Sequence, residues 1–311
     1  MTVSEEQAAD IERQRAEQAP TRRATVPAME EILYRPLPVL DHGFIRVIDY
    51  MGDDSAIVQA ARVSYGRGTR AVRDDAGLIR YLIRHRHSSP FEMCEIKLHV
   101  KLPIFVARQW IRHRTANVNE ISARYSILDD QVYIPLPEHL AAQSSDNRQG
   151  RGETLPSDQA EAVRAQLRAA GERAYELYSE LLNEADNGHK LAPGRDGLSR
   201  ELARMVLPLN VYTQWYWKTD LHNLLQFVSL RADPHAQYEI RAYAEVLQDV
   251  LRRWVPLTWD AFQDCRIEGA SLSGTALAVV RRLLAGEEVT RESSGLSARE
   301  YREVMATLGR S

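Results

Sequence analysis

The segment MCEIKLHVKL, residues 93–102, alternates strictly between apolar and polar side chains. One side carries the apolar residues Cys94, Ile96, Leu98, Val100 and Leu102. A period of two is typical of a β-strand with one face against a core and the other in water, most often in an antiparallel sheet. Pro103 follows and favours a helix over PIFVARQWIRHR, because the first helical position needs no N–H donor. The middle of the chain is therefore expected to run from a strand directly into a helix.

Helical spacing of apolar residues dominates the rest of the chain. We expect helices over SAIVQAARVSY (capped by Ser55), DAGLIRYLIRHRH, residues 157–186, LSRELARMV, LHNLLQFVSLRAD and AQYEIRAYAEVLQDVLRRWV. Two further strands are expected over GFIRVIDYMG and LPLNVYTQWYWKTD. Many helices with few strands predict an α+β fold.

The two ends of the chain differ from its middle. Residues 1–36 are charged and predict a mobile N-terminal tail with a short helix over SEEQAADIERQRAEQ. Residues 37–270 form the expected main domain, with a polar loop at 144–159, and residues 271–311 a C-terminal helical extension.

Composition excludes several classes of protein. The net charge of −3 lacks the basic excess of a general nucleic-acid binder. The two cysteines, Cys94 and Cys265, form no C-x-x-C pair, which favours a reduced, cytoplasmic protein. No apolar run approaches the roughly 20 residues of a membrane span, and the N-terminus has no signal-peptide pattern. We therefore expect neither a nucleic-acid nor a membrane partner.

The densest group of polar residues is RHRTANVNEISARY, from Arg112 to Tyr125. Arginine forks bind phosphate and carboxylate, and Asn119 and Ser122 can hydrogen-bond a heterocycle. On a helix, Arg112 and Arg114 would point to nearly opposite sides and serve different ligands. A solvated helix end is the simpler alternative, but the interleaved apolar residues favour a binding site.

Other charged residues stand in apolar surroundings. Arg231 follows FVSL and Arg204 lies within ELARMV, and a cation in such a place is usually paired or directed at a ligand. Asp233 is expected to cap the next helix, with Pro234 as its first residue. In RHRHSSPFE, the pair His85 and His87 could bind a metal, but no third ligand has a usual spacing, so a surface turn is preferred. We expect no metal site.

These segments carry a family resemblance. RHRTANVNEISAR resembles the signature R-H-R-x-x-S-x-N-x-x-S-x-R of the flavin-dependent thymidylate synthases, the ThyX family, and matches six of its seven fixed residues. Asn117 replaces a serine. ARVSY, HSSPFE, LPIFVARQW, ELARMVLPLN and LRADPHAQYEI also resemble family segments in the same order, across roughly residues 40 to 265. The tail and the extension look peculiar to this chain.

The resemblance implies a mixed α/β fold with a central sheet flanked by helices, and a reaction. A methylene group passes from methylenetetrahydrofolate to C5 of dUMP, tightly bound FAD delivers the hydride that completes the methyl group, and NADPH reduces the flavin. No cysteine attacks the uracil. The family works as a homotetramer with shared active sites.

The resemblance also implies residue roles. Arg231 matches the arginine that favours ionisation of the uracil, and is the expected catalytic residue. The dUMP site would comprise Gln109, Trp110, Ile111, Arg112, Glu120, Ile121, Ser122, Ala123, Arg124, Arg204 and Arg231. The FAD site would comprise Ser89, Arg112, His113, Arg114, Glu120, Asp220, Leu221, His222 and Gln226, with Ser64 and His87 as weaker candidates. Asp220 and Gln226 replace family asparagines, which puts the details of that contact in question.

Three alternatives stay open from the sequence. An RNA- or nucleotide-binding module could use the arginines with the aromatic residues of YTQWYWK. A flavoprotein could oxidise NADPH without making thymidylate. A metal-dependent hydrolase could use His85 and His87.

Overall fold

The computed structural model describes residues 5–63, 75–125, 127, 130–145, 150–185 and 188–310. It divides the chain into two compact units, one ending at Asp260 and the other beginning at Ala261. Within these residues, no helix is both long and apolar enough to cross a membrane.

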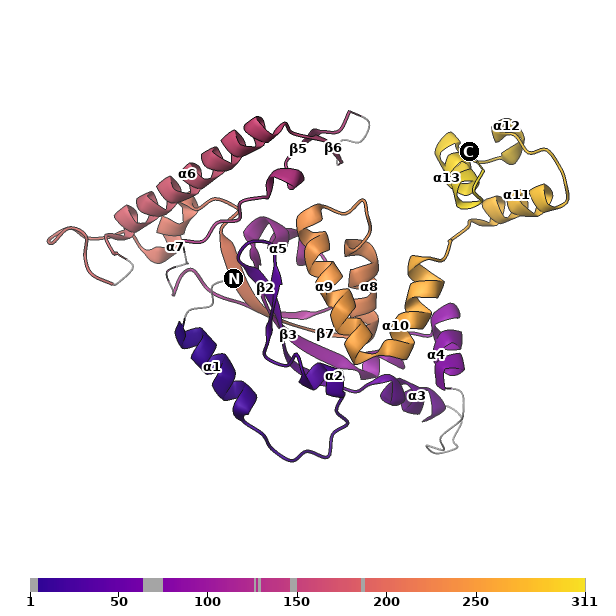
Figure 1. Cartoon of the computed structure of the whole chain (residues 1–311), viewed down its shortest axis with the longest axis horizontal. Helices are drawn as coiled ribbons and strands as arrows, with labels where there is room; N and C mark the ends of the chain where they lie inside the picture. Colours follow the sequence, from indigo (N-terminus) through magenta and orange to yellow (C-terminus); the bar gives the residue numbers. More distant parts are fainter. Residues whose placement is uncertain are drawn as a thin grey trace. The chain divides into compact units, whose positions relative to one another are not determined.

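A five-stranded sheet forms the centre of the first unit (Figure 1). Its strands, in spatial order, are β1 (Pro36–Val39), β2 (Gly43–Met51), β3 (Glu95–Pro103), β7 (Tyr212–Asp220) and β4 (Asn117–Glu120). All neighbouring pairs are antiparallel. The expected α+β fold and the strands β2, β3 and β7 are thereby confirmed.

One face of the sheet is packed with apolar side chains. The alternating apolar residues of β3 are all buried, and Leu98 lies opposite Trp217 in the register of β3 with β7. Three helices cover this face: α5 (Ile104–Trp110), α8 (Leu221–Arg231) and α9 (Tyr238–Trp254). Trp110 joins them to the sheet, with its ring centroid 4.5 Å from Phe227, 5.5 Å from Trp217 and 5.9 Å from Tyr243. This aromatic cluster fixes α5 and α8 in place.

The other face of the sheet is polar and partly open. His99 stacks on Tyr216 with ring centroids 5.1 Å apart and planes 9° from parallel. One ring nitrogen of His99 lies 3.1 Å from Arg46 Nη2 and the other 3.0 Å from Gln214 Oε1. Burial, together with the charge of Arg46, lowers the pKa of His99 to about 4. Tyr216 itself is 41% exposed.

The remaining helices of the first unit lie around this centre. They are α1 (Glu5–Ala16), α2 (Pro27–Glu30), α3 (Asp54–Val63), α4 (Asp75–Arg84), α6 (Ser157–Leu182), α7 (Arg200–Ala203) and α10 (Pro256–Phe262), whose end passes into the second unit, with short 3-10 helices η1 (Phe91–Met93), η2 (Pro137–His139) and η3 (Arg204–Val206). Arg15 of α1 donates to the main-chain oxygens of Glu31 and Leu33, and Ile11 is buried. Part of the predicted tail is therefore held by hydrogen bonds.

Three local expectations were wrong. Asp53, not Ser55, caps α3, because its carboxylate accepts from the N–H of Ala56 at 3.0 Å. The predicted polar loop at 144–159 contains a hairpin arm, since β5 (Ala141–Gln143) pairs with β6 (Arg151–Thr154). Asp233 does not cap α9, whose cap position is Gln237; it accepts instead from the N–H of His235 at 2.7 Å in a local turn.

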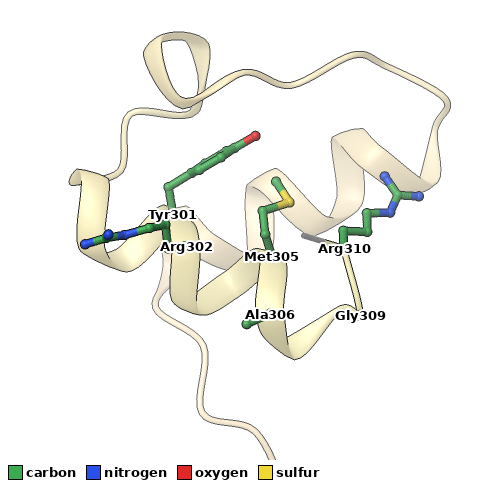
Figure 2. Close-up of a pocket in the computed structure, with 6 residues that line it drawn as sticks. All are labelled: Tyr301, Arg302, Met305, Ala306, Gly309 and Arg310. Carbon is green, nitrogen blue, oxygen red and sulfur yellow. The ribbon is translucent and has the colours of Figure 1, made fainter.

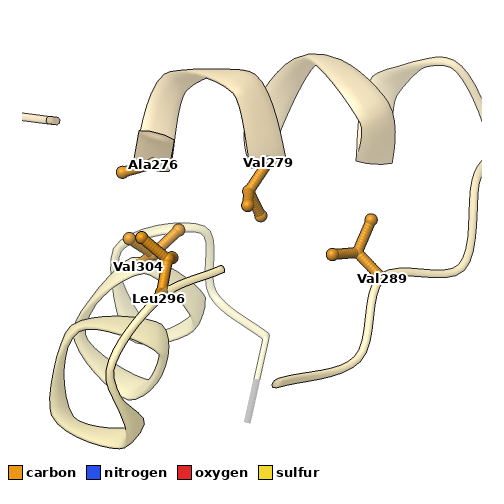
Figure 3. Close-up of a cluster of buried hydrophobic side chains, with 5 residues drawn as sticks. All are labelled: Ala276, Val279, Val289, Leu296 and Val304. Atoms are coloured by element: carbon orange, nitrogen blue, oxygen red, sulfur yellow. The ribbon is translucent and has the colours of Figure 1, made fainter. Parts of the chain in front are cut away.

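The second unit is a small helical module. It contains a short π-helix, η4 (Gln263–Ile267), followed by α11 (Gly274–Leu284), α12 (Arg291–Ser294) and α13 (Ala298–Thr307). Figure 3 shows the core that these last three helices enclose, built from Ala276, Val279, Val289, Leu296 and Val304. All of these buried side chains come from the second unit, so this unit has a hydrophobic core of its own.

Candidate active site

The signature stretch begins where α5 ends. The helix stops at Trp110, so Arg112, His113 and Arg114 lie in the turn after it, and Asn117–Glu120 form the edge strand β4. This corrects the expectation of a loop and of two arginines on one helix. β4 pairs with β7, with Asn119 opposite Tyr216, and all four of its residues are exposed. The stretch therefore offers its polar side chains at an accessible edge of the sheet.

His113 is held from several sides. Its Nε2 lies 3.0 Å from the hydroxyl of Thr115, and its ring meets that of Phe227 edge-on at 5.5 Å. Burial and then the charge of Arg231 lower its pKa, while a hydrogen bond with the main chain of Asn223 acts in the opposite direction. The imidazole is thus neutral at pH 7 and ties the signature turn to α8.

Asp220 occupies the N-cap position of α8. Its carboxylate accepts from the main-chain N–H of Asn223 at 2.9 Å and from the side-chain amide of the same residue at 2.6 Å. Both carboxylate oxygens are therefore engaged within the helix cap. His222 and Gln226, four residues apart, share one face of α8. Asp220 is therefore the N-cap residue of α8.

Arg231 lies at the other end of α8 and reaches back to α5. Its Nη2 donates to the main-chain oxygen of Gln109 at 3.4 Å. Its Nε is buried, and within the described residues it has no hydrogen-bond partner. Burial lowers the pKa of the guanidinium. A partly desolvated cation with an unused donor favours an anionic or strongly polar ligand.

Arg124 and Arg204 are more exposed than Arg231 and lie on two segments that Arg200 joins. The Arg124 guanidinium lies 5.4 Å from the ring centroid of Tyr125, and its main-chain N–H donates to Ser122 Oγ at 3.3 Å. Arg200 donates to the main-chain oxygen of Tyr125 at 2.8 Å. Arg204 Nε donates to the oxygen of Glu201 at 3.2 Å. These contacts leave both guanidinium groups accessible.

Direct contacts join part of the predicted site. Gln109, His113, Asp220 and Arg231 form one connected group through the contacts above. Glu120 is exposed but is held by the hydroxyl of Thr213 at 2.7 Å. Of the remaining predicted residues, several are exposed: Ile111, Arg112, Arg114, Ile121 and Gln226.

Trp110 and Leu221 do not fit their predicted ligand contacts. Neither has any solvent-exposed surface, and both belong to the core beneath the site. Ala123 is 7% exposed and packs with Val211. A side chain without accessible surface cannot touch a ligand, so Trp110 and Leu221 support the site from within.

Ser89 and His87 lie in the exposed segment before η1. η1, which follows them, adjoins α8, and the N–H of Leu221 donates to the oxygen of Cys94 at the end of η1 at 2.8 Å. His87 and His85 have ring centroids 6.4 Å apart and both contact the ring of Tyr81. The described residues contain no cluster of three or more metal-ligating side chains. Ser64 lies outside the described residues.

The residues that hydrogen-bond to the predicted site residues could not be predicted from the sequence motifs. Thr115, Thr213 and Asn223 each contact a predicted site residue, and Thr219 donates to the main-chain oxygen of Thr115 at 3.0 Å. Only Asn223 left a signal, since an Asp followed three residues later by a polar side chain at a helix start is typical of a capping arrangement. The threonines are brought in by the pairing of strands.

Comparison with known proteins gives a consistent family. The profile of the family described as "Thymidylate synthase complementing protein" matches residues 46–257. The flavin-dependent thymidylate synthase of Ruegeria pomeroyi is 61% identical over 310 residues, covering 100% of both chains. That of Gluconobacter oxydans is 60% identical over 308 residues, covering 99% of each. The tail and the extension are thus shared with relatives, which corrects the expectation that they are peculiar to this chain.

A solved structure extends the comparison to the fold. The UMP/dUMP methylase PolB from Streptomyces cacaoi, bound with 5-Br UMP, is 34% identical, with a TM-score of 0.63. The match covers 73% of this chain and 96% of that one. Sequence and fold agree, and the chain belongs to the family of flavin-dependent thymidylate synthases.

Proposed function

We propose that this protein makes thymidylate from dUMP, with methylenetetrahydrofolate as the carbon donor, FAD as the hydride carrier and NADPH as the reductant of the flavin. The main observation behind this proposal is the accessible signature stretch, residues 112–124, beside Arg231. The Nε of Arg231 is buried and has no hydrogen-bond partner among the described residues. Relatives named flavin-dependent thymidylate synthase and a neighbour bound with 5-Br dUMP support the reaction class.

Arg231 is proposed as the catalytic residue. Removing a proton from the uracil, or adding electron density to its ring, places negative charge on the pyrimidine. A guanidinium held against the Gln109 carbonyl, in a partly desolvated position, stabilises that charge more than it would in water. Because it binds the developing anion better than neutral dUMP, its contribution falls mainly on turnover.

The exposed group, Arg124, Arg204 and Ser122, is proposed to bind the phosphate of dUMP. Two accessible guanidinium groups and a hydroxyl match a phosphate, which accepts several hydrogen bonds at once. Gln109, Glu120 and Ile121 complete the proposed nucleotide site. Contacts with a phosphate far from the reacting carbon are the same before and during reaction, so they set affinity rather than rate.

The flavin is proposed to bind along the signature turn and the start of α8. Arg112 and Arg114 are exposed and suit its pyrophosphate, and His222, Gln226 and Ser89 offer hydrogen bonds. When bound, the reduced flavin supplies the hydride. His113 holds this turn against α8 through its neutral ring rather than adding a charge. Cys94, buried with its pKa raised to about 12, has no thiolate to attack a pyrimidine.

The active form is proposed to be a homotetramer with shared active sites, in the cytoplasm. The signature residues Asn117–Glu120 form an exposed edge strand, and one face of the sheet is partly open, with Tyr216 41% exposed. A second copy of the chain would cover this edge and this face. Two free cysteines suit a reducing compartment.

The test is thymidylate formation from dUMP by the purified protein with FAD, NADPH and methylenetetrahydrofolate, each omitted in turn. Product that requires all of them supports the proposal. NADPH consumption and a flavin spectrum without product would favour a flavoprotein that has lost methylation. Neither product nor bound flavin would overturn the assignment.

A further inference from the structure

The C-terminal unit carries a groove along α13. It has a volume of about 630 Å³ and is lined by Tyr301, Arg302, Met305, Ala306, Gly309 and Arg310. Figure 2 shows Met305 and Ala306 in the middle of this row, with Arg302 and Arg310 on opposite sides of them. The groove thus has an apolar floor with a cation on each side.

The groove is not a gap in the core of the unit. Val304, Leu296 and Val279 already fill that core (Figure 3). Met305 packs against it from one side. The hydroxyl of Tyr301 donates to the oxygen of Val289 at 2.8 Å, which fixes one wall. Ala306 is exposed. The apolar floor is therefore a surface feature of a module that is already packed.

Three ion pairs neutralise charges elsewhere in the unit, and none of them involves the arginines of the groove. Arg282 pairs with Glu287 at 2.8 Å, and Arg299 with Glu303 at 2.8 Å. Arg291 pairs with Glu292 at 3.1 Å. Arg302 and Arg310 are exposed and, within the described residues, have neither an ion pair nor a side-chain hydrogen bond. The groove consequently presents two unpaired positive charges.

The two positive charges beside the groove determine which kind of ligand fits it. Residues 271–311 carry six arginines and five glutamates, a net charge of +1, which is too small for a nucleic-acid surface. A second α13 in the same groove would place arginine against arginine. An amphipathic helix with acidic residues beside its apolar stripe matches both the floor and the flanking cations.

We infer that the C-terminal unit is a docking module, and that an acidic amphipathic helix of another protein binds along α13 between Arg302 and Arg310. The unit lies outside the matched family region, residues 46–257, yet relatives share it over the full chain. Docking is thus separate from the reaction and does not rest on the proposed function.

The test is fluorescence anisotropy with the full-length protein and a labelled helical peptide. The probe carries leucines at positions i, i+4 and i+7, with glutamates on both sides of that stripe. Its control peptide has glutamine in place of each glutamate. We expect saturable binding of the acidic peptide, at least about tenfold tighter than binding of the glutamine peptide.

Single substitutions test whether the acidic peptide binds in the groove along α13. R302E and R310E should each weaken the acidic peptide by about tenfold or more, and A306E should do the same by placing a like charge on the floor. R281E is the matched control, because Arg281 is exposed but does not line the groove. It should leave affinity within about twofold, and enzyme turnover should be unchanged in all four.

Three results would overturn the inference. They are no saturable binding of the acidic peptide, equal binding of both peptides, or an equal loss in R281E. Self-association of the protein that A306E abolishes would assign the groove to a second copy instead. Circular dichroism of each variant separates these outcomes from unfolding.

Discussion

Arg231 differs from Arg124 and Arg204, in the same unit, in how strongly the folded chain buries and holds its guanidinium group. Arg231 is half-buried, its pKa is lowered by burial, and Nη2 is held by the Gln109 carbonyl. Arg124 and Arg204 are exposed and contact only nearby side chains and main chain. Since desolvation strengthens electrostatics, Arg231 suits the developing charge of a reaction and the two exposed arginines suit binding.

The largest effect is expected for R231A. Loss of a desolvated cation at the reacting ring should lower kcat by about 100- to 1000-fold, the usual scale for removing one such donor. FAD should stay bound, which its visible spectrum would show. R173A, a change of an exposed arginine on α6, is the control. Turnover close to that of the unmodified protein in R231A would end the proposed role.

A smaller effect concerns His99, on the open face of the sheet. Its folded pKa of about 4 lies below the ordinary value of 6.5 because of burial and then Arg46. The unfolded chain therefore binds a proton that the folded chain does not, and stability falls as pH drops from about 6.5 toward 4. The shift corresponds to about 3 kcal/mol at most.

Urea unfolding at pH 7.5 and pH 4.5, with and without H99Q, would measure this contribution. The fall in free energy of unfolding between these pH values should be smaller in H99Q than in the unmodified protein. An equal fall in the free energy of unfolding in H99Q and in the unmodified protein would show that His99 takes up a proton as easily in the folded chain as in the unfolded one. The open face of the sheet would then be less desolvated than the site of Arg231.

R124A and R204A test whether the exposed arginines affect substrate affinity rather than turnover, in contrast to Arg231. Each should raise KM for dUMP by about tenfold, the loss of one charge-assisted hydrogen bond, with kcat nearly kept. Steady-state kinetics over a range of dUMP concentrations separates the two parameters. A fall in kcat as large as that of R231A would erase the distinction between Arg231 and the exposed arginines.

The smallest effect is expected at Asp220. D220N keeps the acceptor for the Asn223 main-chain N–H but loses the one for its side-chain amide, so it should lower the free energy of unfolding by about 0.5 kcal/mol, whereas D220A should lower it by about 1 kcal/mol. Thermal unfolding of both variants measures the difference. If D220N instead weakens FAD binding strongly, the carboxylate has a role beyond the helix cap.

The strands β2, β3 and β7 and the helices α4, α6, α8 and α9 could be predicted because their apolar periodicity is strong. β4 could not, since Asn117–Glu120 is exposed and becomes a strand only by pairing with β7. The hairpin of β5 and β6 lacks a core pattern for the same reason. Trp110 was placed in the nucleotide site by its neighbours in the signature, but its burial depends on α8 and α9.

The sequence alone determined the family, the α+β class and the identity of Arg231 as the notable cation, because local periodicity and an ordered set of motifs are properties of the chain itself. Only the tertiary structure decided that His113 is a neutral link to α8, that Asp220 is a helix cap, and that Arg231 is half-buried while Arg124 is exposed. Burial and hydrogen bonding depend on residues brought together from distant positions, and spacing along the chain does not encode those distances.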